Sequence, residues 1–208
     1  MTTLIADPLV AAVPVIETHE PLVDVRRFGI ASSGSRSARL VRRSVAERLA
    51  LAQQALPGGV RIVVVEGFRS PEAQQRIFDG YTAELRAAYP DRDEDELHRL
   101  ATRYVAPLEV APHVAGAAVD LLLSDAGGRR LWMGTEVDAT PEQSDGACMF
   151  DAAGIGTEAR DNRTMLAEAL GAAGLVNYPT EWWHWSFGDR YWAHVTGAAY
   201  AFYGPVSA

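Results

Sequence analysis

The chain has 208 residues, with 27 acidic side chains against 19 Arg or Lys side chains, so its formal net charge is −8. All 19 of these positions are Arg, and the absence of Lys excludes a Schiff-base lysine, a pyridoxal-phosphate anchor and the lysine of a Walker-type phosphate site. The acidic balance argues against nucleic acid or an anionic membrane surface as a partner. A composition with 48% hydrophobic and 22% charged residues is typical of a folded globular protein, and this length supports one domain with a sizeable core.

Cysteine content and the N-terminal pattern bear on the compartment. Cys148 is the only cysteine, so neither an internal disulfide nor a cysteine-based zinc site is possible. No Lys or Arg precedes Arg26, and the apolar run 9–16 is interrupted by Pro14, which is not the pattern of a secretory signal. No run approaches the ~18 apolar residues of a membrane span. We therefore expect a cytoplasmic protein.

The first half of the chain contains weak and strong structural signals. Residues 1–36 are rich in Pro, Ser and Gly, and we expect them to be a lead-in segment with one strand, part of the same domain as residues 37–208. Apolar residues at helical spacing predict a helix over 37–56, ended by Pro57 and two glycines. The β-branched run 62–65 predicts a buried strand.

Further elements follow in mixed order. A Ser-Pro-Glu start predicts a helix over 70–89, and an acid-capped helix is expected over 94–104. We predict a strand over 117–123, a helix over 161–173, and strands and turns around an aromatic cluster in the last thirty residues. Because strands and helices do not alternate regularly, the pattern favours an α+β fold over a doubly wound sheet.

Asp120 is the most unusual polar residue of the predicted strands. Its carboxylate lies in an Ala-Val-Asp-Leu-Leu-Leu run, where it either points to solvent or is compensated by charged partners or a metal. His113 precedes it by seven residues, so one straight strand would place the two on opposite faces. Pro112 and Gly116 offer a bend that could bring both to one centre.

A second polar pair lies in the Trp-rich stretch near the C-terminus. Glu181 and His184 are three residues apart, and the alternative to a functional role is an aromatic core that holds one satisfied histidine. Together with His113 and Asp120, His184 would supply three ligands, the number that a catalytic zinc takes from a protein. Glu181 would then serve as general base.

Arg69 stands between the predicted strand and the Ser70 helix cap. A helix N-terminus carries partial positive charge, so a guanidinium beside it requires an anion. A salt bridge to a neighbouring carboxylate and a functional anion explain this equally well.

Three motifs, in this order within residues 60–190, carry a resemblance to a known family: Gly67-Phe68-Arg69-Ser70-Pro71, His113-x-x-Gly116-x-Ala118-x-Asp120 and Glu181-Trp182-Trp183-His184. The chain resembles the zinc D-alanyl-D-alanine dipeptidases of the vancomycin-resistance type, peptidase family M15, which share a fold with the Hedgehog signalling domain. The resemblance implies one domain in which helices pack on a small mixed or antiparallel sheet. It implies hydrolysis of a D,D-dipeptide, above all D-Ala-D-Ala.

The resemblance also assigns residues. It implies one Zn²⁺ per chain, held by His113, Asp120 and His184. It implies Glu181 as the base and Arg69 as the cation that stabilises the transition state. Two further residues would contact the substrate: Asp138, as a buried carboxylate that receives the free ammonium, with Glu136 as rival, and Tyr104 in the same pocket.

One position departs from the family pattern. The family has Ser two residues before the first histidine, and here that position is Ala111, which affects substrate preference and leaves the metal ligands in place. Three alternatives therefore stay open. They are a zinc D,D-carboxypeptidase or endopeptidase acting on the peptides of cell-wall peptidoglycan, a non-catalytic zinc-binding module, and an amide hydrolase for an unusual dipeptide. The expected partner is a small dipeptide, with no nucleic acid and no membrane, and the sequence does not predict the oligomeric state.

Overall fold

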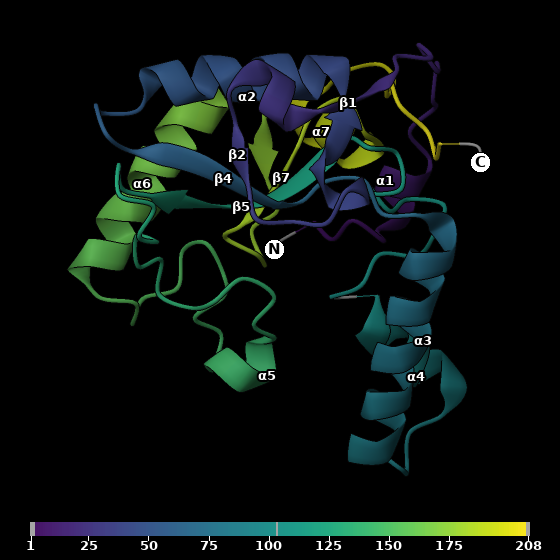
Figure 1. The fold of residues 1–208 in the computed structure, drawn as a ribbon. Coiled ribbons are helices and arrows are strands. Elements are labelled where there is room, and N and C mark those ends of the chain that lie inside the picture. The colour runs from purple at the N-terminus through teal and green to yellow at the C-terminus, as the bar shows by residue number, and fades with distance from the viewer. Residues whose placement is uncertain (1–2, 103, 207–208) are drawn as a thin grey trace.

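A mixed five-stranded sheet runs through the middle of the fold (Figure 1). The computed structural model describes residues 3–102 and 104–206. The strand order across the sheet is β2 (Ala31–Ser32), β4 (Arg61–Glu66), β5 (Ala118–Ser124), β7 (His184–Ser186) and β6 (Val176–Asn177). β2 is parallel to β4, and the other neighbours are antiparallel. The expected α+β fold with a small mixed sheet is thereby confirmed.

Helices pack around this sheet, and two of them extend away from it. The helices are α1 (Pro8–Ala11), α2 (Arg43–Ala55), α3 (Pro71–Ala88), α4 (Glu94–Ala101), α5 (Pro141–Ser144), α6 (Thr157–Ala172) and α7 (Arg190–Thr196). α2 and α6 contact each other, whereas α3 and α4 form a hairpin that projects from the body of the protein (Figure 1). Across the described chain, none of the helices combines the length and apolarity needed to cross a bilayer.

The core lies around β5, the middle strand of the sheet. All seven residues of this strand are buried, as a strand covered on both faces should be. On β4, Ile62 and Val64 are fully buried, and Val45 and Leu49 of α2 belong to the same core. Asp120 is therefore placed in the most protected part of the molecule, where a carboxylate needs partners.

The predicted helix over 37–56 is wrong in its first third. Residues 37–39 form a 3₁₀ turn, and residues 40–42 form the strand β3, which pairs with β1 (Leu22–Asp24), so that Val41 lies opposite Val23. Val41 also fits the apolar spacing of α2, which is why local periodicity extended the helix too far. The lead-in accordingly contains two strands, β1 and β2, and the helix α1, instead of one strand.

Other predicted boundaries agree more closely. α3 begins at Pro71, and the Ser70 hydroxyl accepts a hydrogen bond from the Ala73 amide at 3.2 Å, as the start pattern indicates. α4 ends at Ala101, before the predicted end, and Arg103 of that prediction lies outside the described residues. α6 begins four residues before the expected start, at Thr157. α7 lies within the last thirty residues, where the sequence predicted strands and turns around an aromatic cluster and no helix.

Candidate active site

Three neighbouring strands place polar side chains in one row across the sheet. Asp120 of β5 pairs with His184 of β7 on one side and with Glu66 of β4 on the other. The register between β4 and β5 shifts between Val64 and Glu66, so a bulge makes Glu66, in place of Val65, the residue opposite Asp120. Residues directly opposite each other share a face of the sheet, so these three side chains converge.

His113 reaches the same place from the turns that precede β5. The Ala117 amide donates to the Pro112 carbonyl at 3.1 Å, and the Gly116 amide donates to the His113 carbonyl at 3.0 Å. Gly116 has φ of +65°, a conformation that favours glycine, and a Cβ there would lie 2.4 Å from the end of the Leu22 side chain, which would have to move. The bend expected at Pro112 and Gly116 is present.

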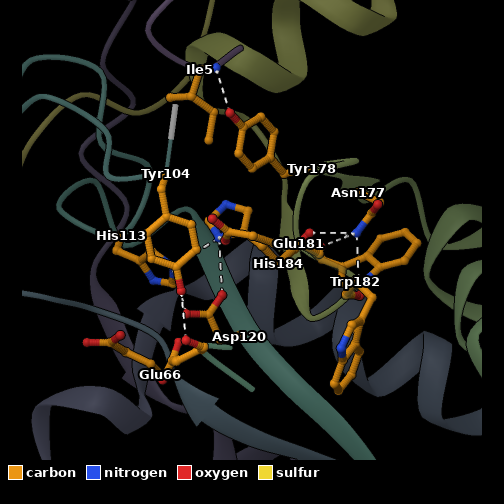
Figure 2. A network of polar contacts seen from close by, with 12 residues as sticks. Ile5, Glu66, Tyr104, His113, Asp120, Asn177, Tyr178, Glu181, Trp182 and His184 are labelled. Carbon is orange, nitrogen blue, oxygen red and sulfur yellow. Dashed lines mark hydrogen bonds and ion pairs between the residues drawn. The ribbon is translucent and has the colours of Figure 1, made fainter. Parts of the chain in front are cut away.

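The atoms of this cluster have the spacing of a metal site (Figure 2). His113 Nε2 lies 3.2 Å from His184 Nδ1 and 3.3 Å from Asp120 Oδ2, and His184 Nδ1 lies 3.1 Å from Asp120 Oδ1. Three ligands of a tetrahedral zinc, each about 2.0–2.1 Å from the ion, are separated by about 3.3 Å. All three residues are buried, and their ligand atoms lie within 4.8 Å of one another. The group fits a zinc ion with one position left open.

Burial alone would lower the pKa of His113, but the charge of Asp120 raises it, so a metal ion that binds this cluster displaces a proton from the histidine. His113 Nδ1 donates to the Gly67 carbonyl at 2.7 Å, which leaves the lone pair of Nε2 directed into the cluster. Burial alone would raise the pKa of Asp120, but His113 and then His184 lower it well below its usual range. The carboxylate is therefore anionic, as a ligand must be.

Glu181 lies beside the cluster, in the turn that leads into β7. Its Oε2 is 3.7 Å from His184 Nδ1, outside the tight triangle of ligand atoms. Asn177 Nδ2 donates to the Glu181 and His184 carbonyls, both at 3.0 Å, and thereby fixes the turn between them (Figure 2). Burial, followed by the charges of Asp120 and Asp138, raises the pKa of Glu181 well above its ordinary value. Such a carboxyl can both take and return a proton.

Arg69 is held on both sides. Its guanidinium forms a two-contact ion pair with Glu66, in which Nε is 3.0 Å from Oε1, and its Nη1 donates to Gln74 Oε1 at 2.9 Å. Gln74 Nε2 in turn donates to the Ala106 carbonyl at 2.7 Å. The salt bridge considered from the sequence therefore exists, and Arg69 also lines the cavity that the cluster faces.

Asp138 and Tyr104 meet at the edge of the site. The Tyr104 hydroxyl donates to the Asp138 carbonyl at 2.8 Å, and Asp138 has φ of +66°, a left-handed conformation that Asp adopts more readily than most other residues. Asp138 is exposed and not buried as expected, although loss of hydration within the site, and then Asp120 and Glu66, raise its pKa to about 6.

A cavity of about 510 Å³ joins these parts. All seven site residues predicted from the sequence line it, together with Ala111. Glu136, the rival to Asp138, does not line it, and pairs instead with Arg130 at 3.3 Å. The cavity is of the size that small ligands occupy.

A family model described as D-Ala-D-Ala dipeptidase, peptidase M15, matches residues 31–200. The chain belongs to this family. It is a metallopeptidase, and the resemblance noted in the sequence is confirmed.

Relatives of this M15 peptidase span most of its length. D-alanyl-D-alanine dipeptidase of Synechocystis sp. is 27% identical over 94% of this chain and 95% of its own length. D-alanyl-D-alanine dipeptidase of Escherichia coli is 28% identical over 68% of this chain and 61% of its own. The solved structure of VanYB in complex with D-alanine-D-alanine has a TM-score of 0.52 and 18% identity over 91% of this chain and 93% of that one, a similarity of fold.

Three residues of the M15 site had no clear sequence signal: Glu66, Gln74 and Tyr178. Tyr178 lines the cavity, its ring lies edge-on to His184 at 5.9 Å, and its hydroxyl accepts a 3.5 Å hydrogen bond from the Ile5 amide (Figure 2). Glu66 ends the β-branched run, and Gln74 lies one turn into α3. For these two residues, nearness to Arg69 in the sequence was the available hint of a role in the site.

Proposed function

We propose that this chain is a zinc dipeptidase that hydrolyses D-Ala-D-Ala to two free D-alanine molecules. The observation that carries the proposal is that a three-ligand metal cluster, the Glu181 carboxyl and the Arg69 guanidinium all face one cavity. A structural zinc site is closed by four protein ligands and requires neither a base nor an added cation. We take D-Ala-D-Ala as the substrate because both bacterial relatives are named D-alanyl-D-alanine dipeptidase.

The proposed mechanism divides the work among the cavity residues. His113, Asp120 and His184 would hold the zinc ion, which when bound would supply a Lewis acid for the scissile carbonyl and for water. Glu181 accepts the proton of the attacking water and returns it to the leaving amine. Arg69 faces the carbonyl oxygen, where negative charge develops during attack.

Substrate length is read at the other end of the cavity in this proposal. Asp138 pairs with the free ammonium of the dipeptide, and Tyr104 holds the Asp138 backbone through its carbonyl. A site that pairs this ammonium rejects substrates that lack the charge, because its own carboxylate is then left without a partner. Ala111 removes a hydroxyl from the cavity wall and leaves these pairings in place.

The setting of the enzyme is also proposed. Residues 1–36 belong to the same domain as residues 37–208, in support of which β2 pairs with β4 and Ile5 lines the cavity. We place the enzyme in the cytoplasm, where Cys148, a buried free thiol, would stay reduced. The net charge of −8 supports a small dipeptide, and neither nucleic acid nor membrane, as its partner.

The test of the function is an amine-release assay of the zinc-loaded protein on L,L-, L,D- and D,D-dipeptides. We expect D-Ala-D-Ala to have the highest kcat/KM. Preference for N-blocked or longer D,D-peptides would favour the carboxypeptidase, and preference for a different dipeptide would favour the amide hydrolase. Zinc binding with no hydrolysis of any peptide would favour the non-catalytic module.

Metal content tests the ligand set. The wild type should carry about one zinc per chain, and His184→Ala should lose it, because two protein ligands hold zinc far more weakly than three. Metal analysis after gel filtration measures both. His98→Ala, on the exposed side of α4, is the matched control and should keep the metal. Unchanged zinc content in His184→Ala would contradict the assignment.

Asp138→Asn should reduce kcat/KM for the free dipeptide by roughly 10- to 100-fold, the loss expected when a charged hydrogen-bond partner is removed. The kcat/KM for N-acetyl-D-Ala-D-Ala should change far less, so the difference in kcat/KM between the two substrates should become smaller. Glu136→Gln, in the same segment but off the cavity, should change neither. If the wild type cleaves both forms equally well, no residue reads the ammonium.

The pH profile offers an independent check of Asp138. Its pKa is raised to about 6, so the carboxylate is charged above that pH and neutral below it. The kcat/KM of the free dipeptide should therefore fall as pH drops through about 6, because this ratio reports the free enzyme. Asp138→Asn should remove that step, and a step that persists in the variant would assign it to another group.

A further inference from the structure

Arg163 of α6 is a fully buried cation that the proposed mechanism does not use. Its guanidinium donates to four backbone carbonyls. Nε bonds Met133 at 2.7 Å, Nη2 bonds Ala147 at 2.7 Å, and Nη1 bonds Met149 at 2.6 Å and Phe150 at 3.0 Å. Two separate loop segments therefore converge on one side chain.

The charge of Arg163 is balanced by dipoles. Among the described residues no carboxylate lies within ion-pair distance of it, and burial, followed by the charge of Arg160, lowers its pKa to about 10. It is still a cation at neutral pH. A buried cation is expensive compared with an apolar side chain of similar volume, so stability alone does not account for it.

The first of the two segments leads to Asp138. Met133, whose carbonyl accepts from Arg163, begins a stretch of six residues that ends at Asp138. A Cβ on Gly134 would lie 2.9 Å from Arg163 Nη2, and Gly134 has φ of +99°, so this backbone packs directly on the guanidinium. The far end of the stretch is held by the Tyr104 hydroxyl.

The second segment leads to Glu181. Within residues 147–150, the Cys148 carbonyl accepts a hydrogen bond from the amide of Trp182, the residue next to Glu181, at 3.0 Å. The Trp182 indole lies 5.6 Å from the guanidinium carbon and donates to Thr135 Oγ1 at 2.8 Å, which ties it back to the first segment. The Arg163 guanidinium therefore contacts both segments, the one that leads to Asp138 and the one that binds the residue next to Glu181.

We infer that Arg163 is a positioning residue that sets the spacing between Asp138 and Glu181, and through it the length of substrate that is accepted. The inference rests on the proposed function, in which a dipeptide spans these two carboxyls. Lys keeps the charge but lacks the planar fork of donors, so it cannot hold both segments at once.

A double-mutant cycle of Arg163→Lys and Asp138→Asn tests this role. Arg163→Lys alone should raise the KM for D-Ala-D-Ala by about tenfold, the size of coupling seen between residues of one network. In the Asp138→Asn background it should raise KM by less than about threefold, because the position of a missing carboxylate no longer matters. Equal factors in the two backgrounds, as a purely structural residue would give, overturn the inference.

Matched variants and a second readout keep the test decisive. Arg160→Lys, three residues earlier on α6, loses contacts to the Phe150 and Ala152 carbonyls, and no contact to the stretch that ends at Asp138, so its effect on KM should be the same in both backgrounds. Should Arg163→Lys fail to fold, Thr135→Val cuts the link between Trp182 and the first segment and should give the same non-additive pattern with a smaller factor.

Calorimetric binding of D-Ala-D-Ala in the Glu181→Ala background yields the same cycle without turnover. Absence of hydrolysis by the wild type then contradicts the proposed function, whereas additive effects on binding contradict the role of Arg163.

Discussion

Glu181→Ala should lower kcat by about 10²–10⁴-fold while the protein retains its zinc, since general acid–base catalysis contributes a factor of this size. Glu181 Oε2 lies 3.7 Å from His184 Nδ1, close enough to serve a water at the open position and outside the ligand triangle. Steady-state kinetics and metal analysis of the same preparation measure both quantities.

Two outcomes would contradict this role of Glu181. Loss of zinc in the variant would make Glu181 a ligand, and near-normal turnover would remove it from the mechanism. Glu136→Ala, which deletes an exposed carboxylate outside the cavity, is the control for a general effect of lost negative charge.

Arg69→Ala should lower kcat by about 10²–10³-fold, the usual cost of removing one group that stabilises an oxyanion, and should raise KM much less. The reason is that the charge Arg69 faces develops in the transition state and is absent from the bound substrate. Arg69→Lys should recover only part of the rate. It restores the positive charge, but an ammonium cannot hold Glu66 with two contacts and Gln74 with a third.

The alternatives for Arg69 give different kinetics. A defect confined to KM would make Arg69 an anchor for the substrate carboxylate. A lowered melting temperature with normal kcat per folded molecule would make the ion pair with Glu66 purely structural. Arg76→Ala, which removes an exposed guanidinium from the same cavity wall on α3, should have little effect on kcat.

Elements with strong local signals were predictable from the sequence, and elements made by distant pairing were not. Ser70 and Pro71 mark the start of α3 to the residue, because a cap and a fixed φ act locally. Val41 follows the periodicity of a helix, yet it pairs with Val23, a contact that no window around residue 41 contains. The second strand of the lead-in was missed for the same reason.

The site could be predicted from the sequence where its residues are unusual for the stretch in which they stand. A carboxylate among aliphatic residues and a histidine among tryptophans stand out, and the structure brings Asp120 and His184 together as strand partners. Their roles stay predictions until tested. The role of Glu66 could not be predicted, because it faces Asp120 only through a β-bulge that the sequence does not indicate. The exposure of Asp138 could not be predicted either, because it depends on the contact that Tyr104 makes with this loop.

The row of Glu66, Asp120 and His184 across three strands limits where this chain can gain or lose residues without disturbing the site. One residue inserted into or deleted from β5 would turn Asp120 to the other face of the sheet and separate it from both neighbours. A change of length outside these strands, in the α3–α4 hairpin or in the stretch that carries Asp138, would leave this register intact. Those are the segments that shape the cavity wall, so substrate preference can diverge by changes in loop length while the metal ligands stay in register.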